Sequence, residues 1–519
     1  MVKNCRRVLL LLLFSAAPLF LFVPVFADEM PGGQFAKHII LFIGDGMQLE
    51  HEIAASRYLT GKDNSLSFHS FPKQLHVTTW DINTYNEYAD KSNAPHYDPA
   101  HFDPNIGYDP SRGGARPYPL ARDGRESYFL EYPASDPEHR NGRGPATDSA
   151  SSATAFATGN KTESGNIAWL AGDAPGGSVD SIAALMRQQH GAAIGVISTV
   201  PFNHATPAAF VSHNTARGNY FTGYKGYAGM GIADEIIKIT RPDVVIGGGH
   251  PLWGNPDNVV DKGFMSRSLY EELSHMHEYA FIERIEGSDC RDALNKTAAR
   301  AVIEGRRLFG LFGGEGGNFE TPVPAHDPGN PHIDRATNEN PLLAEAVTSA
   351  LDVLALDHNG FFLLAEQGDI DWANHANDYK WMIGTVWDLH QAVQAAVDFV
   401  DRPNDGLDWS NTLIIVTADH SNSFMRLNGD KPLGAGELPV QDCASGLCRY
   451  PDGSVSYGAR GHTNELVMLY ARGDAAALFE QYRGQRYPGT DIIDNTNIFD
   501  VMAQAAGLQV GQTVSRSTR

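Results

Sequence analysis

The chain has 519 residues and a formal net charge of −22, and 42% of its residues are hydrophobic. The composition is that of a globular protein, and the length suits one large α/β domain with insertions or a few smaller domains. So acidic a chain is a poor candidate for nucleic-acid binding, and any anionic substrate would need positive charge at its own site.

Residues 1–27 have the features of a secretory signal peptide. Lys3, Arg6 and Arg7 precede a long apolar run that ends in a small-x-small cleavage pattern. The alternative is an uncleaved membrane anchor, because the run is long enough to span a bilayer. No second long apolar run follows. We therefore predict a periplasmic or secreted protein that has no membrane span once the signal is removed.

Six apolar runs predict short buried strands, at 38–43, 193–198, 243–246, 360–365, 412–417 and 465–471. Helical patterns lie between them, at 181–190, 341–357 and 379–400. Most of the runs are continuous rather than alternating, which indicates strands covered on both faces. The expected fold is α/β, with a central, mostly parallel sheet and helices on both faces. We expect residues 28–519 to form a single catalytic domain.

Two segments interrupt this pattern and are predicted to be surface insertions. The first, at about 81–145, is rich in Pro, Gly, Asp, Asn and Tyr, and we expect little regular structure in it. The second lies at 424–458. Four residues of the first could bind an extra metal, although turn-forming Asp-Pro pairs beside incidental histidines are the simpler interpretation. They are His96, Asp98, His101 and Asp103.

The cysteines give one further expectation. Cys5 lies in the predicted signal peptide. Cys443 and Cys448 are five residues apart in the second insertion, and in an exported protein they are predicted to form a local disulfide. Cys290 is left over, and we expect it to be a buried free thiol.

A run of small residues from 147 to 159 predicts a closely packed helix that ends at Gly159. Its first turn carries Asp148 and Ser149. A serine at that place lies in the positive end of the helix dipole, which favours an alkoxide and an anion bound beside it. The alternative is that Ser149 only caps the helix.

Polar residues recur just past the carboxyl ends of the predicted strands, where ligands bind in open α/β sheets. They are Asp45, Asn203, His204, Thr206, Glu366, Asp419 and His420. This recurrence predicts one site that is built from several distant segments.

Carboxylate and imidazole groups around this predicted site favour metal binding. Asp371 and His375 are four residues apart, so on a helix they share one face, a spacing that suits zinc. His462, shortly before the last strand, would add a third imidazole. Each signal also has a simpler interpretation, which is a surface pair for Asp371 and His375 and a turn at Asp45 or Asp419.

The order and spacing of these residues together resemble the alkaline phosphatase family. Two segments are especially specific: Thr-Asp-Ser-Ala-x-Ser-Ala-Thr-Ala at 147–155 and Val-Thr-Ala-Asp-His at 416–420. The resemblance runs from about residue 37 to about 510, outside the insertions. It implies a hydrolase of small phosphate monoesters with Ser149 as the nucleophile, two zinc ions and one magnesium ion. A homodimer is compatible with it, but the sequence itself does not give the oligomeric state.

The resemblance also implies which residues hold each ion and the phosphate. It places Asp371, His375 and His462 on the first zinc, and Asp45, Asp419 and His420 on the second. It places Asp45, Thr206 and Glu366 on magnesium. Arg217, eleven residues after Thr206, matches the arginine that grips the phosphate, with Asp148 beside it; a bidentate guanidinium suits that task. Taken alone, Arg217 could equally be a surface ion pair.

Two positions depart from some family members. His204 stands where those have an aspartate, and Trp372 stands where they have a lysine. The imidazole is compatible with a water-mediated contact to magnesium, whereas the indole removes a cation near the phosphate. We therefore expect a changed affinity for phosphate and a changed metal preference at the third site.

Two other functions remain as alternatives. One is a phosphodiesterase or sulfatase on the same metal scaffold, and the other is an exported protein that binds metal or phosphate without turnover. The context of Ser149 and the presence of Arg217 argue against the first, and the intact Ser149 argues against the second.

Overall fold

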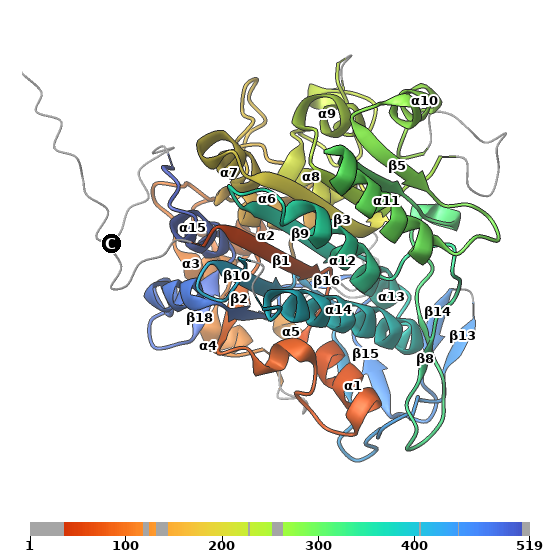
Figure 1. Cartoon of the computed structure of the whole chain (residues 1–519). Helices are drawn as coiled ribbons and strands as arrows, with labels where there is room; N and C mark the ends of the chain where they lie inside the picture. Colours follow the sequence, from red (N-terminus) through yellow and green to blue (C-terminus); the bar gives the residue numbers. More distant parts are fainter. Residues whose placement is uncertain are drawn as a thin grey trace, which may run out of the picture. The chain divides into compact units, whose positions relative to one another are not determined.

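The computed structural model describes residues 36–117, 124–130, 144–226, 229–251, 263–403, 406–444 and 446–510, so the predicted signal peptide lies outside the described residues. At its centre is a ten-stranded sheet in the order β18-β2-β17-β10-β1-β9-β3-β4-β6-β5 (Figure 1). In that order the strands are Ile492–Asp494, Lys73–Thr78, Val467–Arg472, Thr412–Thr417, His38–Gly44, Phe361–Gln367, Ala193–Pro201, Val244–Gly248, Arg307–Leu311 and Tyr279–Glu283. Only β17 runs against its neighbours β10 and β2; the other pairings in the described sheet are parallel. The predicted mostly parallel sheet is confirmed.

The middle of the sheet consists of continuous apolar strands. Every residue of β1, β9 and β10 is buried, as expected for strands with helices on both faces. All six predicted strands are present. The strands β2, β5, β6 and β18 were not predicted, because three of them have charged or exposed ends that shorten the apolar run and β18 has only three residues.

Helices cover both faces of the sheet (Figure 1). On one face lie α12 (Leu343–Leu354) and α14 (Tyr379–Val400), with α1 (Leu49–Thr60) and α11 (Cys290–Glu304) packed beside them. On the other lie α7 (Ile182–His190) and α8 (Ala205–Val211), with α6 (Ser149–Thr158) and α15 (Thr496–Ala505) packed beside them. The predicted helices at 181–190, 341–357 and 379–400 are confirmed as α7, α12 and α14. Within the described ranges, no helix is both long and apolar enough to cross a membrane.

The first insertion is more regular than the sequence predicted. Asp81 caps α2 (Ile82–Ser92). Asp103 caps α3 (Pro104–Gly107) and Asp109 caps α4 (Pro110–Gly113), and both of these short helices begin with proline. The Asp-Pro pairs at 103–104 and 109–110 therefore start short helices, because the aspartate accepts a hydrogen bond from a free amide and proline has no amide hydrogen to satisfy.

The extra metal site considered for this insertion has no support in the structure. His96 pairs with Asp90 at 2.7 Å, and Asp103 is engaged in capping α3. Among the residues described between 81 and 145, no three His, Cys, Asp or Glu side chains come together as a metal site would require.

An aromatic cluster fastens the first insertion to the rest of the protein. Its buried rings are Trp80, Tyr85, Tyr88, Tyr108, Tyr128, Phe129, Phe424 and Tyr487. Phe129 belongs to α5 (Glu126–Phe129), and its ring centroid lies 6.2 Å from that of Phe424, which belongs to the second insertion. The tyrosines that suggested a loop by composition therefore form a satellite core.

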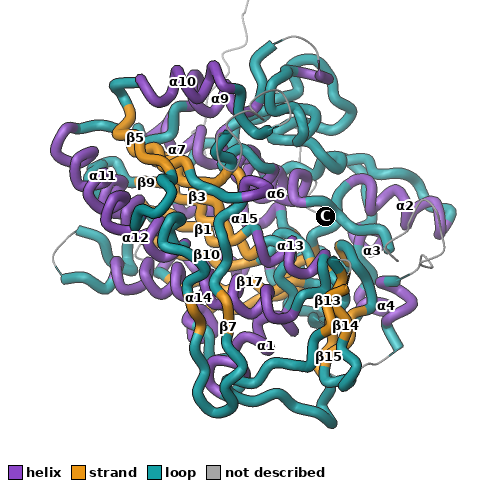
Figure 2. The backbone as a smooth tube through the Cα atoms, turned by 90° about the vertical axis from the view of Figure 1, so that its right-hand side faces the viewer, coloured by secondary structure: helices purple, strands orange, loops and turns teal. Residues whose placement is uncertain are grey.

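The second insertion carries β12 (Met425–Leu427), β13 (Asp442–Ala444), β14 (Leu447–Arg449) and β15 (Val455–Tyr457). The predicted disulfide between Cys443 and Cys448 is present and joins β13 to β14, and Cys290 is a buried free thiol. The amide of Cys448 donates to Ala376 O at 3.0 Å, so this hairpin lies against the end of α13 (Asp369–His375), as Figure 2 shows.

A buried lysine ties the end of the chain to α6. Lys161 Nζ donates to Trp80 O at 2.6 Å and to Asn495 Oδ1 at 2.7 Å, and it lies 3.1 Å from Asp494 Oδ2. Asn495 in turn donates to Ser152 Oγ on α6 at 3.2 Å. The segment from β18 to α15 is thereby fixed against the helix that begins at Ser149.

We expect Phe129→Ala to lower the free energy of unfolding by about 3–5 kcal/mol, the usual cost of removing a buried phenyl ring. Phe129 is 1% exposed and lies where the two insertions meet. Denaturant titration of the purified variant would measure this loss. A loss below about 1 kcal/mol would show that the aromatic cluster is peripheral to stability.

Candidate active site

The candidate site lies at the carboxyl edge of the central sheet. Asp45 follows β1, Asp419 follows β10, and Glu366 lies near the end of β9 opposite Ile43 and Ser198 of the neighbouring strands. Because β17 is antiparallel, its first residue also lies at this edge, which brings the preceding β16 (His462–Thr463) there. A ladder with β11 (Ser421–Asn422) holds β16 in place.

One group of ligand atoms surrounds the hydroxyl of Ser149. His420 Nε2 lies 3.3 Å from Asp45 Oδ1 and 3.4 Å from Asp419 Oδ2. Ser149 Oγ lies 3.3 Å from His420 Nε2 and 3.5 Å from Asp45 Oδ2. Asp45, Asp419 and His420 each offer a ligand atom within 4.8 Å of the others, and all three are buried. The structure thus brings together the three residues expected to hold the second zinc.

A second group lies beside the first. Asp371 and His375 share one face of α13, and His375 Nε2 lies 3.2 Å from Asp371 Oδ2. His462 Nε2 lies 3.4 Å from Asp371 Oδ1 and 3.3 Å from His375 Nε2. The rings of His462 and His420 stack at 3.6 Å, so the two groups adjoin. The residues expected on the first zinc are therefore also together.

Backbone carbonyls fix the protonation of both imidazoles in the second group. His375 Nδ1 donates to Arg460 O at 2.8 Å, and His462 Nδ1 donates to Thr147 O at 2.7 Å. Because each Nδ1 is engaged, the Nε2 atom of each ring is directed at the Asp371 carboxylate and is the nitrogen available to a cation. Such a carbonyl contact is the usual support of a metal-binding histidine.

A third group contains Asp45, Glu366 and Thr206, the residues expected on magnesium. Glu366 is fully buried and accepts from Ser198 Oγ at 2.5 Å, and the buried Thr206 hydroxyl has no hydrogen-bond partner among the described residues. Thr206 lies in the first turn of α8, after β3. A donor set of oxygens alone suits a hard cation such as magnesium.

The buried carboxylates carry the electrostatic signature of a cation site. Burial, together with Asp419 and Asp371, raises the pKa of Asp45 well above its usual value. Burial also raises the pKa of Glu366 to about 7 and that of Asp419 to about 6. Burial opposes ionisation of Asp371 too, but His375 and His462 bring its pKa well below the usual value.

Acceptor atoms without hydrogen bonds in the same cluster also indicate a cation site. Asp45 Oδ1, Glu366 Oε1 and Asp419 Oδ2 are buried and accept no hydrogen bond from the part of the chain that the structure describes. Buried acceptors without donors are costly, and divalent cations would satisfy them. The residues present therefore fit two cations with nitrogen and oxygen ligands and one with oxygen ligands.

Helix α6 aims Ser149 and Asp148 at this cluster. Asp148, not Ser149, is the N-cap: its side chain accepts from the amide of Ser151 at 3.0 Å, and Ser149 is the first helical residue. Arg217 Nη1 lies 2.9 Å from Asp148 Oδ2. Although burial opposes its ionisation, Arg217 and the neighbouring amides bring the pKa of Asp148 to about 2. Asp148 thus holds a charged guanidinium beside the serine.

His204 and Trp372 form the rim next to Arg217. His204 Nε2 lies 3.4 Å from Arg217 Nη2, and the His204 ring lies 6.4 Å from the Trp372 ring, centroid to centroid. Burial and the charge of Arg217 lower the pKa of His204 to about 3, so its imidazole is neutral. The predicted site residues are therefore contiguous, apart from Asn203, whose side chain donates to Phe264 O at 2.7 Å.

Sequence reasoning did not identify two supporting residues. Asn422 Nδ2 donates to Asp371 Oδ1, and Ser198 Oγ donates to Glu366. Both follow signals that were recognised, since Asn422 is two residues after His420 and Ser198 ends a predicted strand. A polar residue within a run that is otherwise predicted to be buried is the sequence signal that could have identified each of them.

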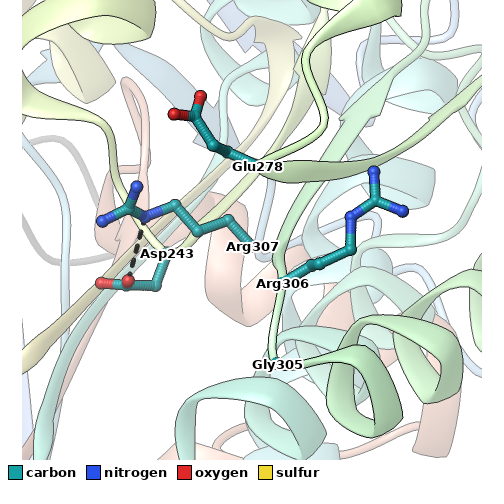
Figure 3. Close-up of a pocket in the computed structure, with 5 residues that line it drawn as sticks. All are labelled: Asp243, Glu278, Gly305, Arg306 and Arg307. Carbon is teal, nitrogen blue, oxygen red and sulfur yellow. Dashed lines mark hydrogen bonds and ion pairs between the residues drawn. The ribbon is translucent and has the colours of Figure 1, made fainter.

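A separate pocket of about 360 Å³ lies at the opposite, amino end of the sheet (Figure 3). It is lined by Asp243, Glu278, Gly305, Arg306 and Arg307. Arg307 Nε lies 3.3 Å from Asp243 Oδ1, so charges in this pocket neutralise one another. None of the predicted site residues lines it.

Comparison with known proteins identifies the family of the chain. The profile of the alkaline phosphatase family matches residues 131–445, more than half of the chain. An alkaline phosphatase of Escherichia fergusonii is 31% identical over 388 residues, which cover 70% of this chain and 74% of that protein. Alkaline phosphatase 4 of Bacillus subtilis is 31% identical over 287 residues, 55% of this chain, and the alignment spans about half (52%) of that relative.

The fold has solved counterparts. A variant of the alkaline phosphatase from the Antarctic bacterium TAB5, with Mg bound in its M3 site, superposes with a TM-score of 0.56. The two share 18% sequence identity, and the superposition covers 92% of this chain and 99% of that one.

We expect cation binding to release more protons at about pH 5.5 than at about pH 8. In the metal-free protein Glu366 and Asp419 carry protons below their raised pKa values of about 7 and 6, and a cation displaces those protons. At the higher pH both are already ionised. Calorimetric titration of chelator-treated protein with zinc and then with magnesium, in buffers of different ionisation enthalpy, would count the protons that each metal releases.

The matched control is Glu366→Gln, which cannot bind a proton at that position. It should release about one proton fewer at the acidic pH and lose little at the alkaline pH. Equal proton release at both pH values in the unaltered protein would contradict the assignment of these carboxylates as ligands.

Proposed function

Since the chain belongs to the alkaline phosphatase family, we propose that it is an exported phosphomonoesterase that transfers the phosphoryl group first to Ser149 and then to water. The observation that carries this proposal is the position of the Ser149 hydroxyl, buried between His420 and Asp45 with Arg217 close to the same helix end. A serine hydroxyl is a weak nucleophile, and such surroundings are what activates one.

We assign three cations to the site. The first zinc would be held by Asp371, His375 and His462, and the second by Asp45, Asp419 and His420. Magnesium would be held by Asp45, Thr206 and Glu366. Buried acceptor atoms without hydrogen bonds support the second zinc and magnesium. The short distances among Asp371, His375 and His462 support the first zinc. The Mg in the M3 site of the TAB5 variant supports a third cation. When bound, these cations would neutralise phosphate charge and favour ionisation of the serine and of water.

The residues of the chain then have distinct tasks. Ser149 Oγ attacks phosphorus in line with the ester oxygen, so that the new P–O bond forms as the old one breaks and the alcohol leaves. Arg217, held by Asp148, grips two phosphate oxygens through its two terminal nitrogens. The amides at the start of α6 add partial positive charge at the same place. A water molecule then cleaves the phosphoserine and releases inorganic phosphate.

Location and assembly are part of the same proposal. The signal-like segment at 1–27 and the disulfide between Cys443 and Cys448 support a periplasmic or secreted protein. A single catalytic domain over 28–519 and a homodimer remain predictions. Rates on a phosphate monoester, a phosphate diester and a sulfate ester would separate the proposed activity from the phosphodiesterase and sulfatase alternatives.

We expect Ser149→Ala to abolish the covalent intermediate and to lower turnover by several orders of magnitude. Folding and metal content should change little, because only one hydroxyl is removed. Acid trapping with labelled phosphate should label the unaltered protein and Ser268→Ala, which alters an exposed serine on α10 (Arg267–His275), but not Ser149→Ala. Equal labelling of Ser149→Ala would remove Ser149 as the nucleophile.

We expect Trp372→Lys to tighten inhibition by inorganic phosphate several-fold and to lower turnover at alkaline pH. The change adds a cation near Arg217, and tighter product binding slows release. His204→Asp should instead strengthen magnesium binding, since a carboxylate suits that ion better than an imidazole does. Unchanged phosphate inhibition in Trp372→Lys would show that the indole is a passive rim residue.

A further inference from the structure

The side of the site opposite Ser149 decides which leaving groups fit. In an in-line displacement the ester oxygen departs from the face of phosphorus opposite the attacking Ser149. Ser149 lies against Asp45 and His420, whereas Asp371 and His375 belong to the adjoining group on α13. A phosphate bound between the two groups would therefore release its leaving group beside α13.

Helix α13 offers one side chain that could contact the leaving group without serving a cation. Its seven residues are buried except for Trp372 and His375, which are partly exposed. His375 is assigned to a cation, and its two ring nitrogens are already directed at Arg460 O and at the site. The indole of Trp372 is the remaining surface, and the adjacent His204 contacts Arg217.

The chemistry of this surface favours a planar, uncharged group. An indole is uncharged and donates only through its ring N–H, so it cannot pair with an additional phosphate or carboxylate. Its face stacks well on aromatic and heteroaromatic rings. The protein as a whole carries a net charge of −22, which also disfavours leaving groups with extra negative charge.

We propose that Trp372 is a stacking platform for the leaving group, so that the enzyme prefers phosphate monoesters of planar, ring-bearing alcohols. Nucleoside monophosphates are the substrate class that this platform selects over sugar and glycerol phosphates. The proposal rests on the phosphomonoesterase activity proposed above and adds a substrate preference to it.

The test compares adenosine 5′-monophosphate with ribose 5-phosphate. Both lose the same primary alkoxide, so the phosphoryl chemistry is matched and only the purine base differs. The ratio of their kcat/KM values isolates the contribution of the base. Stacking on an aromatic side chain should make this ratio about tenfold or more in the unaltered enzyme.

Two substitutions at the platform and one elsewhere sharpen the comparison. Trp372→Ala should bring the ratio close to one, and Trp372→Phe should retain most of it, because a phenyl face also stacks. The matched control is Trp409→Ala. Trp409 is a partly exposed tryptophan just before β10, at the amino end of the sheet, under the guanidinium of Arg472 at 3.8 Å. This control should keep the ratio.

The outcomes separate the two proposals. If ribose 5-phosphate is hydrolysed but the ratio is near one, or if Trp372→Ala leaves a high ratio unchanged, the stacking platform is wrong and the phosphomonoesterase stands. If neither ester is hydrolysed by the zinc- and magnesium-loaded enzyme, the proposed function fails and takes the platform with it. The stacking platform is supported if the unaltered enzyme and Trp409→Ala both show a high ratio of kcat/KM values, Trp372→Phe keeps most of it and Trp372→Ala brings it close to one.

Discussion

Mutual repulsion among buried carboxylates is the constraint around which this structure is built. Asp45, Glu366, Asp371 and Asp419 are all at most 7% exposed and meet at one edge of the sheet. In a protein that is already strongly acidic, ionising all four without compensating charge would destabilise the fold. Cations at the site would relieve that repulsion and stabilise the folded protein. The cluster of carboxylates that destabilises the metal-free protein would therefore also bind and position the cations that reaction with phosphate requires.

One antiparallel strand completes the site. Four parallel strands place ligands at the site because their carboxyl ends lie at that edge of the sheet. A fifth parallel strand would have its first residue at the opposite edge, away from the site. Because β17 is reversed, the segment before it returns to the site and carries His462 beside Asp371. The second insertion lies between Asp419 and His462, so the chain accommodates it without altering either ligand.

Most of the central fold could be predicted because continuous apolar runs mark buried strands directly. The ligands could be predicted because carboxylates and imidazoles at strand ends have few structural reasons to be there. The contacts of Asn422 and Ser198 could not, since they depend on which segments become neighbours in three dimensions. The regularity of the first insertion is hard to predict for a different reason. Proline and aspartate are common in turns, but aspartate before proline also starts a helix, and composition alone does not show that the tyrosines pack into a core.

The contacts between Lys161, Asn495 and Ser152 have a consequence for the order in which the site can assemble during synthesis of the chain. The helix that carries Ser149 is secured by residues more than three hundred positions later in the chain. Until that part of the polypeptide has been synthesised, those partners are absent, and the ammonium of Lys161 has neither Asp494 nor Asn495 to contact. The contacts that secure the helix carrying Ser149 are thus completed only after residues 494 and 495 have been synthesised, so the order of this helix depends on a segment that comes late in the chain.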